Sequence, residues 1–445
     1  MSTRQSTKFV IVGGGLGGAL LAVYLGRAGY EVEVYEMRDD PRLVGPVGGR
    51  SINLALSYRG LCALQAVGLA DEVLQMAVPM RGRMIHSVND GTTFQPYGVD
   101  ESQVINSVSR GGLNATLLNA AARSPSVRLS FNSKCLDVHL DTACVELSDA
   151  NGKGNFSASA DIVLSADGAF SAVRRAMQRQ ERFNYSQEYL EHGYKELTIP
   201  AGPGGAFQLE KNALHIWPRR SFMMIALPNS DGSFTCTLFW PFEGPNSFAA
   251  IATEADLLRF FNEQFPDAAP LMPTLTDDYF ANPVGSMVTV RCRPWHIADR
   301  VALLGDAAHA VVPFYGQGMN ATFEDVLVLD ECMKKWAPDW AQVFVTYEAA
   351  RRPNTDALAD LAIHNFLEMR DHTGSRRFHL KKKAEKTLAR LLPGWFIPLY
   401  TLVTFTRTPY AHAVQRAKQQ TRAVIGVFAV VLVLIAGSLV LLGSR

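Results

Sequence analysis

The sequence lacks the signals of a disulfide-stabilised, metal-binding or nucleic-acid-binding protein. Its six cysteines are scattered over 445 residues without a C-x-x-C pair, which argues against a disulfide framework or a cysteine metal cluster. A net charge of +1, with no zinc-finger spacing, makes nucleic-acid binding a poor hypothesis. We find no 2-His-1-carboxylate pattern, and we therefore expect no metal. The polar start, residues 1–8, is too short for a secretory signal.

The composition instead predicts a large folded enzyme-sized chain. Hydrophobic residues make up 48% and charged residues 19% of the sequence, enough for a sizeable core. A chain of this length is too long for one small domain and fits a bipartite fold.

The chain opens with a strand–helix–strand pattern. Residues 9–13 (FVIVG) form a short β-branched strand, residues 16–28 a helix that Gly29 ends, and residues 31–35 (EVEVY) the next strand. This βαβ unit of about 30 residues predicts the start of a doubly wound parallel sheet.

A glycine-rich turn lies between this strand and helix. Gly13, Gly15 and Gly18 satisfy G-x-G-x-x-G, in which they permit a tight turn, close approach of a pyrophosphate, and close helix packing, respectively. Glu36 ends the second strand, where a carboxylate accepts hydrogen bonds from ribose hydroxyls and repels a 2′-phosphate. We therefore expect tightly bound FAD or NAD, and not NADP, at this turn.

Two further buried strands end in small acidic turns. Residues 161–165 lead into Asp167-Gly168, and residues 300–304 into Gly305-Asp306. Between them, residues 188–242 alternate like a separate sheet, and the chain is predicted to be helical after about residue 342. A second G-x-G-x-x-G does not occur in the sequence.

The C-terminal part contains a run of 20 uncharged residues at 423–442. Such a helix spans roughly 30 Å, the thickness of a bilayer core, and the alternative is a buried core helix. Arg416, Lys418 and Arg422 precede it. We therefore predict a single-pass C-terminal membrane anchor, with the large domain facing the cytosol.

The ordered glycine, D-G and G-D motifs resemble those of the flavoprotein aromatic hydroxylases of the para-hydroxybenzoate hydroxylase type. This resemblance implies an α/β fold: a Rossmann-like FAD-binding fold (GR2 type) with a mixed β-sheet substrate domain and C-terminal helices. The uncharged run adds one predicted transmembrane helix to this architecture. The resemblance implies an FAD-binding domain at 1–76, 104–180 and 285–375, and a substrate domain at 77–103 and 181–284. The C-terminal helical region would cover 376–422 and the transmembrane helix 423–442.

The same resemblance implies which residues hold the cofactor. The ADP half of FAD would lie against the first glycine motif and Glu36, the ribitol against Asp306, and the pyrophosphate and the NAD(P)H path near Asp167. The helix starting near residues 316–320 would stabilise negative charge on reduced flavin through its N–H groups. The full set of predicted cofactor contacts is Gly13, Gly15, Gly17, Gly18, Glu36, Arg38, Ala55, Arg110, Leu136, Asp167, Asp306, Gly318, Met319 and Asn320.

Several stretches between residues 49 and 400 also resemble the kynurenine 3-monooxygenase family, among them GRSINLAL (49–56), MRGRMIH (80–86), PFYGQGMN (313–320) and HNFLEMR (364–370). The resemblance implies hydroxylation of L-kynurenine at ring position 3 with NADPH and O2, through a flavin C4a-hydroperoxide. It assigns the substrate carboxylate to Arg83, Tyr97, Asn365 and Tyr400, and makes Phe314, Tyr315 and Met369 pocket walls. Gln317 is a candidate contact of flavin or substrate, and His309 is interpreted as structural. Eukaryotic family members are held to the mitochondrial outer membrane, and the hydrophobic C-terminal run of this sequence resembles their C-terminal segment.

Three alternatives stay open from the sequence. The chain could be an FAD monooxygenase of another substrate, such as a phenol, a salicylate or a membrane-borne isoprenoid. It could be a flavoprotein scaffold without turnover, or an NAD-dependent dehydrogenase. A flavin spectrum and a substrate panel distinguish these classes.

Overall fold

The first strand of the chain forms the centre of a six-stranded sheet. The computed structural model describes residues 7–44, 53–88, 91–98, 100, 102–150, 152, 154–368, 384–385 and 387–443. The sheet order is β18-β19-β12-β1-β2-β8, parallel except for the β18–β19 pair. The strands are β1 (Lys8–Val12), β2 (Glu31–Tyr35), β8 (Val127–Ser130), β12 (Ile162–Ser165), β18 (His296–Ile297) and β19 (Val301–Leu303). The strands predicted before the D-G and G-D turns are therefore neighbours at the centre of this sheet, and the predicted α/β fold is confirmed.

Helices cover this sheet because its strands are apolar on both faces. Strand β1 buries every residue after Lys8, and helix α1 (Leu16–Arg27) buries nine residues against it and its neighbours. The remaining helices of this half are α2 (Pro41–Val44), α3 (Tyr58–Ala66), α4 (Ala70–Gln75), α5 (Arg110–Ala122) and α6 (Ala172–Met177). Two three-stranded sheets flank it: β9 (Ser133–His139), β10 (Cys144–Asp149) and β11 (Gly154–Ser159), and β3 (Asn53–Leu56), β4 (Val78–Met80) and β7 (Ile105–Ser109).

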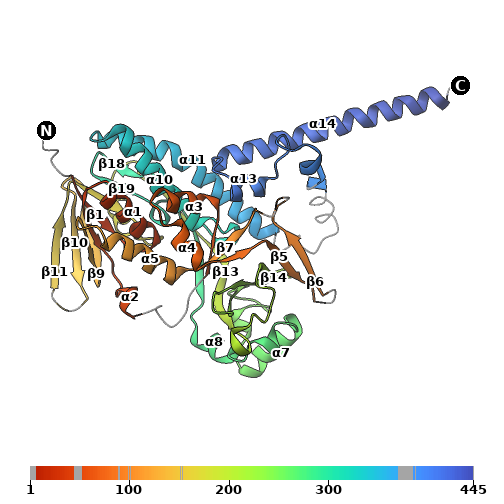
Figure 1. Ribbon diagram of the computed structural model, residues 1–445, viewed down its shortest axis with the longest axis horizontal. Helices are drawn as coiled ribbons and strands as arrows, with labels where there is room; N and C mark the ends of the chain where they lie inside the picture. The colour runs from red at the N-terminus through yellow and green to blue at the C-terminus, as the bar shows by residue number, and fades with distance from the viewer. Residues whose placement is uncertain are drawn as a thin grey trace.

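A second, mixed sheet forms the other half of the molecule. Its order is β17-β13-β16-β15-β14-β5-β6, and only β14 and β5 pair in parallel. The strands are β5 (Gly82–His86), β6 (Thr92–Pro96), β13 (Asn184–Ile199), β14 (Ala213–Arg219), β15 (Phe222–Pro228), β16 (Phe234–Pro241) and β17 (Gly285–Arg293). Helices α7 (Glu254–Gln264) and α8 (Leu275–Ala281) lie at its far end (Figure 1). They enclose a core built from alternate strand residues, as expected for a period of two.

The C-terminal helices pack across both halves. After α9 (Asp306–His309) come α10 (Gly318–Trp336), α11 (Trp340–Leu367), α13 (Leu399–Phe405) and α14 (Tyr410–Gly443). Short 3-10 turns occur at Pro203–Gly205, Phe248–Ala250, Ala269–Leu271 and Pro313–Tyr315. The beginning of α14 packs on α11 and α13, and its far end projects beyond the rest of the molecule (Figure 1).

The predicted transmembrane helix at 423–442 is wrong. Within the part of the chain that the structure describes, no helix combines the length and the apolar character that a bilayer crossing requires. The uncharged run is not a separate element, because it continues α14, whose earlier turns carry Arg416, Lys418 and Arg422. The predicted lipid anchor and membrane localisation are corrected with it.

Candidate active site

The glycine-rich turn after β1 is shaped by close contacts at two positions and is open at the third. Gly13 has φ +101°, which favours glycine, and a Cβ on Gly18 would lie 1.9 Å from the Gly13 carbonyl oxygen. A Cβ on Gly17 would lie 2.6 Å from Cγ2 of Thr322. At Gly15, by contrast, an added Cβ would meet no atom within 4 Å. The open side at Gly15, next to the N-terminus of α1, is where a phosphate could approach the backbone.

Glu36 lies at the end of β2, beside this turn. Its Oε2 accepts the N–H of Gly14 at 2.8 Å, and its Oε1 accepts the N–H of Arg38 at 3.0 Å. Each carboxylate oxygen therefore keeps capacity for a further hydrogen bond. The start of β9 is next to it, since the N–H of Ser133 donates to the Glu36 carbonyl at 2.8 Å. The predicted contact Arg38 thus lies next to Glu36, and the predicted contact Leu136 lies on β9, three residues after Ser133, and is 40% exposed.

The two acidic turns have different environments. Asp167 accepts hydrogen bonds from Ser165 Oγ (2.5 Å) and from the N–H of Ala172 (2.7 Å), so it organises its own turn. Asp306 opens onto a cavity between the two halves of the molecule. Burial raises the pKa of Asp306, while His309 and Arg110 act in the opposite direction. Of the two acidic turns, the G-D turn is thus the one whose carboxylate, Asp306, faces the cavity and is available to a ligand hydroxyl.

The cavity has a volume of about 510 Å³ and brings together residues from distant parts of the chain. Arg83 on β5 lies with its guanidinium 4.8 Å from the ring centroid of Tyr400 and 5.7 Å from that of Tyr97. The two tyrosine rings stack at 5.7 Å. Nε of Arg83 is buried without a hydrogen-bond partner among the residues that the structure describes. Such an arrangement presents a cation and hydroxyl donors to an anionic group.

Asn365 takes a different position from the other predicted carboxylate contacts. Its Nδ2 donates to the carbonyl of Phe314 at 2.6 Å, and it is not among the residues that line the cavity. Phe314 and Tyr315 do line the cavity, and Phe314 stacks on Phe366 at 4.2 Å. Asn365 therefore supports a cavity wall from behind. Met369 lies outside the described residues.

Gln317 precedes helix α10 and lines the cavity. Its side chain is buried, with Oε1 accepting the hydroxyl of Tyr410 at 3.1 Å and Nε2 donating to Ser57 Oγ at 3.3 Å. The amide is therefore already oriented by protein groups before any ligand contacts it.

Asn320 holds the first turn of α10 in place. Its Nδ2 donates to the carbonyls of Ala55 (2.8 Å) and Gly316 (2.9 Å), and it is fully buried. Ala55, Gly318 and Met319 line the cavity, whereas Asn320 does not. The helix N-terminus thus points its backbone at the cavity, with the Asn320 side chain serving the loop that precedes it.

Sequence reasoning missed the wall that the mixed sheet contributes. Alternate residues of β13, β15 and β16 face the cavity, and the residues between them face the core under α7 and α8. The cavity-facing residues are Tyr194, Glu196, Met223, Ile225, Leu227, Thr237 and Phe239. The alternation in the sequence predicted strands here, but it does not distinguish which face meets a ligand.

These features fit an FAD molecule. The open position at Gly15 suits a pyrophosphate, Glu36 a ribose, and Asp306 a hydroxylated chain that leads into the cavity. Arg110, at the start of α5, lines the same cavity. His309, interpreted as structural, has Nε2 2.6 Å from Asp325 and does not line the cavity.

Comparisons with known proteins agree with this geometry. The family model described as "FAD binding domain" matches residues 6–362. The chain is 51% identical to a kynurenine 3-monooxygenase of Myxococcus xanthus, covering 93% of this chain and 89% of that one, and 45% identical to one of Sus scrofa, covering 95% and 89%. The structure of P. aeruginosa PqsL in complex with 2-aminobenzoylacetate has the same fold, with a TM-score of 0.68 at 20% identity over 85% of this chain and all of that one. The cofactor is FAD, and the chain belongs to the kynurenine 3-monooxygenase family.

Proposed function

We propose that this chain hydroxylates L-kynurenine at ring position 3, consuming NADPH and O2. The observation that carries the proposal is the placement of Arg83 beside the stacked rings of Tyr97 and Tyr400, inside the cavity that Asp306 and the start of α10 also face. A half-buried cation whose buried Nε has no hydrogen-bond partner in the described part of the chain calls for an anion, and the kynurenine carboxylate supplies one.

The tyrosines of the cavity act as hydrogen-bond donors in this proposal. Burial raises the pKa of Tyr97 and of Tyr315, so both phenols stay protonated at neutral pH. They therefore donate to the substrate and do not act as bases. Arg83 with Tyr97 and Tyr400 would hold the amino-acid end, leaving the aromatic ring toward the loop 313–318, which we expect to face the flavin.

The chemistry needs little from protein acids and bases. When bound, FAD takes a hydride from NADPH and delivers one oxygen atom of O2 to the ring. The ortho-amine of kynurenine already donates electrons to the ring carbon that is hydroxylated. The walls from the mixed sheet and Phe314 are largely apolar and would exclude water, which protects the reactive stage from wasteful decay.

The experiment is mass analysis of the product formed from L-kynurenine, NADPH and ¹⁸O2 by the purified chain. We expect a product heavier by one oxygen-18 atom, and NADPH oxidation that kynurenine stimulates and a panel of phenols does not. A purified chain that is colourless, or one that leaves kynurenine unchanged, would refute the proposal.

We also propose which parts of the chain form the FAD-binding domain and which form the substrate domain. Residues 1–76, 104–180 and 285–375 would form the FAD-binding domain, and 77–103 with 181–284 the substrate domain. The course of the chain supports this division, since β5, β6 and β13–β17 make one sheet and β1, β2, β8, β12, β18 and β19 another. β17 starts at Gly285, so the third FAD-binding segment would begin with a strand of the substrate sheet.

A further inference from the structure

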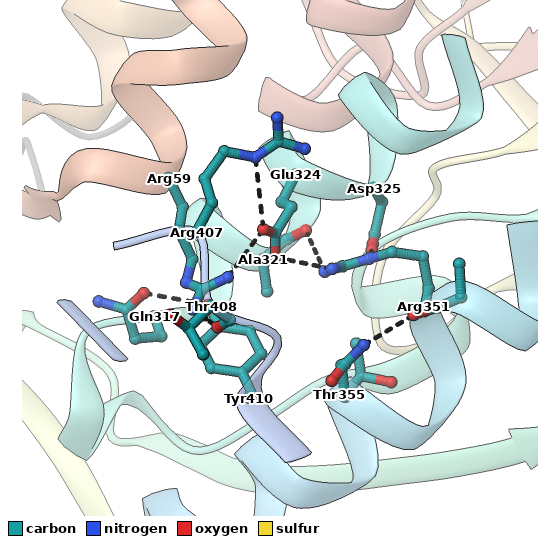
Figure 2. A network of polar contacts seen from close by, with 12 residues as sticks. Arg59, Gln317, Ala321, Glu324, Asp325, Arg351, Thr355, Arg407, Thr408 and Tyr410 are labelled. Atoms are coloured by element: carbon teal, nitrogen blue, oxygen red, sulfur yellow. Dashed lines mark hydrogen bonds and ion pairs between the residues drawn. The ribbon is translucent and has the colours of Figure 1, made fainter. Parts of the chain in front are cut away.

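A network of buried charges joins helices α10 and α11 (Figure 2). Arg351 donates through Nη1 to Glu324 and through Nε to Asp325, each at 2.6 Å. The other oxygen of Asp325 accepts the N–H of Gly305 at 3.1 Å. These charged side chains are almost fully buried, and each contacts a charge of opposite sign. The network therefore holds α10 and the G-D turn in one relative position.

Arg59 of α3 ties the C-terminal segment to this network. Its Nη1 lies 2.7 Å from Glu324, its Nε donates to the carbonyl of Val403 at 3.1 Å, and its Nη2 donates to the carbonyl of Thr408. The guanidinium also lies 4.0 Å from the ring centroid of Tyr410. One fully buried side chain thus holds the segment 403–410 at three points.

Tyr410 extends this connection to the loop 313–318, which lines the cavity. Its hydroxyl donates to Oε1 of Gln317, as Figure 2 shows, and Ser57 takes the other end of the Gln317 amide. Burial raises the pKa of Tyr410, so the phenol stays a donor at any pH used for assay. The orientation of Gln317 in the cavity wall therefore depends on a residue of the first turn of α14.

The same C-terminal segment also supplies the substrate side of the cavity. Tyr400 lies one helical turn before Val403 on α13, and it covers Arg83. Because Arg59 holds the Val403 carbonyl, it also places Tyr400 over the cavity. The segment 400–410 therefore contacts both the Arg83 side and the Gln317 side of the cavity.

We propose that Tyr410 is a positioning residue for the oxygenation reaction. Its hydrogen bond to Gln317 would fix the loop 313–318 against the flavin, while Arg59 fixes Tyr400 over the substrate, so that oxygen transfer is directed to the ring. Tyr410 does not itself line the cavity, and it acts through Gln317. This inference rests on the proposed function for the identity of the substrate.

The test is Tyr410→Phe, with Tyr347→Phe as the matched control. Tyr410→Phe keeps the aromatic ring against Arg59 and removes only the hydroxyl. Tyr347 is equally buried, and its hydroxyl has no hydrogen-bond partner among the described residues. In the FAD-loaded enzyme, we expect Tyr410→Phe to lower the product formed per NADPH oxidised by about fivefold, the equivalent of one hydrogen bond, with a matching rise in hydrogen peroxide. We expect the visible flavin spectrum to shift as well, and Tyr347→Phe to change neither.

A second variant tests whether Tyr410 acts through Gln317. In a Gln317→Met background, Tyr410→Phe should cause no further loss of coupling or spectral shift, because the partner is already absent. An equal additional loss in that background would overturn the proposal, as would wild-type coupling and spectrum in Tyr410→Phe. If Tyr410→Phe lowers the melting temperature, the comparison is made at a temperature where both variants stay folded and flavin-loaded.

The two proposals fail in distinguishable ways. If the wild-type chain gives no hydroxylated kynurenine, the proposed function fails, and the flavin spectrum of Tyr410→Phe still reports on the contact with Gln317. If the wild-type chain hydroxylates kynurenine and the Tyr410→Phe enzyme matches it in coupling, KM and spectrum, only the positioning role fails.

Discussion

Replacing Arg83 with methionine should separate substrate binding from folding. Arg83 is the cation that we propose for the substrate carboxylate, and its Nε has no hydrogen-bond partner among the described residues. Hydrogen bonds to charged groups contribute about 1.5–3 kcal/mol, which corresponds to a rise in the kynurenine KM of roughly 10- to 150-fold. FAD should stay bound, because Arg83 lies on β5, away from the glycine-rich turn.

The same substitution, Arg83→Met, should change the free energy of unfolding of the substrate-free protein far less than it changes the free energy of substrate binding. The guanidinium contacts the rings of Tyr97 and Tyr400, and such cation–π contacts stabilise by about 0.5–2 kcal/mol. Desolvation of an incompletely paired guanidinium opposes this by about 1–3 kcal/mol, and methionine fills similar apolar space. We therefore expect the free energy of unfolding to change by less than about 1 kcal/mol, measured by denaturant titration without substrate.

Steady-state kinetics with Arg81→Met as the control completes this test. Arg81 lies two residues earlier and is exposed, so its loss should leave KM unaltered. An unchanged KM in Arg83→Met would remove the carboxylate role. A raised KM with a comparable loss of unfolding free energy would instead indicate a folding defect.

Three further predictions concern the cofactor turn, the buried network and pH. Gly15→Ala should weaken FAD binding, followed by flavin fluorescence, without destabilising the apoprotein, because the new Cβ meets no protein atom. Gly18→Ala should instead lower the free energy of unfolding of the apoprotein by about 1–3 kcal/mol, because its Cβ would overlap the Gly13 carbonyl oxygen. Equal apoprotein stability of Gly15→Ala and Gly18→Ala would contradict this. Arg351→Met should destabilise by about 3–5 kcal/mol in a denaturant titration, since it leaves two buried carboxylates without their shared cation; a loss below about 1 kcal/mol would show that the network contributes little. Burial lowers the pKa of His215 to about 4 from the ordinary 6.5, so the unfolded chain takes up a proton at a higher pH than the folded chain. The free energy of unfolding should therefore fall by up to about 3 kcal/mol as the pH drops from 6.5 to 4. His215→Gln should flatten that part of the pH–stability curve, and an unaltered slope would exclude the histidine as its source.

The parts of the fold that could be predicted are those coded by neighbouring residues. The β1–α1–β2 unit, the tight turn at Gly13 and the carboxylate at Glu36 lie within 30 residues, and both periodicity and glycine content mark them. The strands before the D-G and G-D turns were found for the same reason, because short apolar runs bounded by small residues are typical of buried parallel strands. Their order in the sheet, with β12 beside β1 and β19 beside β12, follows from pairing over long distances.

The C-terminal run shows where a local pattern misleads. Uncharged composition over 20 residues predicted a separate membrane helix, yet the run continues α14 from a first turn that packs beneath the cavity wall. Its start at Tyr410 is set by contacts with Arg59 and Gln317, which are 351 and 93 positions away in the chain and leave no local signal.

The sequence alone specifies the dinucleotide-binding turn of this protein, because that turn is a short contiguous segment with its own backbone requirements. The substrate side depended on folding. Arg83, Tyr97 and Tyr400 meet only when α13 packs over the mixed sheet. Asn365, on α11, is instead bonded to the Phe314 carbonyl behind the cavity wall. Tertiary packing also decides which face of β13, β15 and β16 lines the cavity, because the opposite face packs against α7 and α8. Period-two alternation is symmetric between the two faces, so burial against α7 and α8 on one side had to break that symmetry.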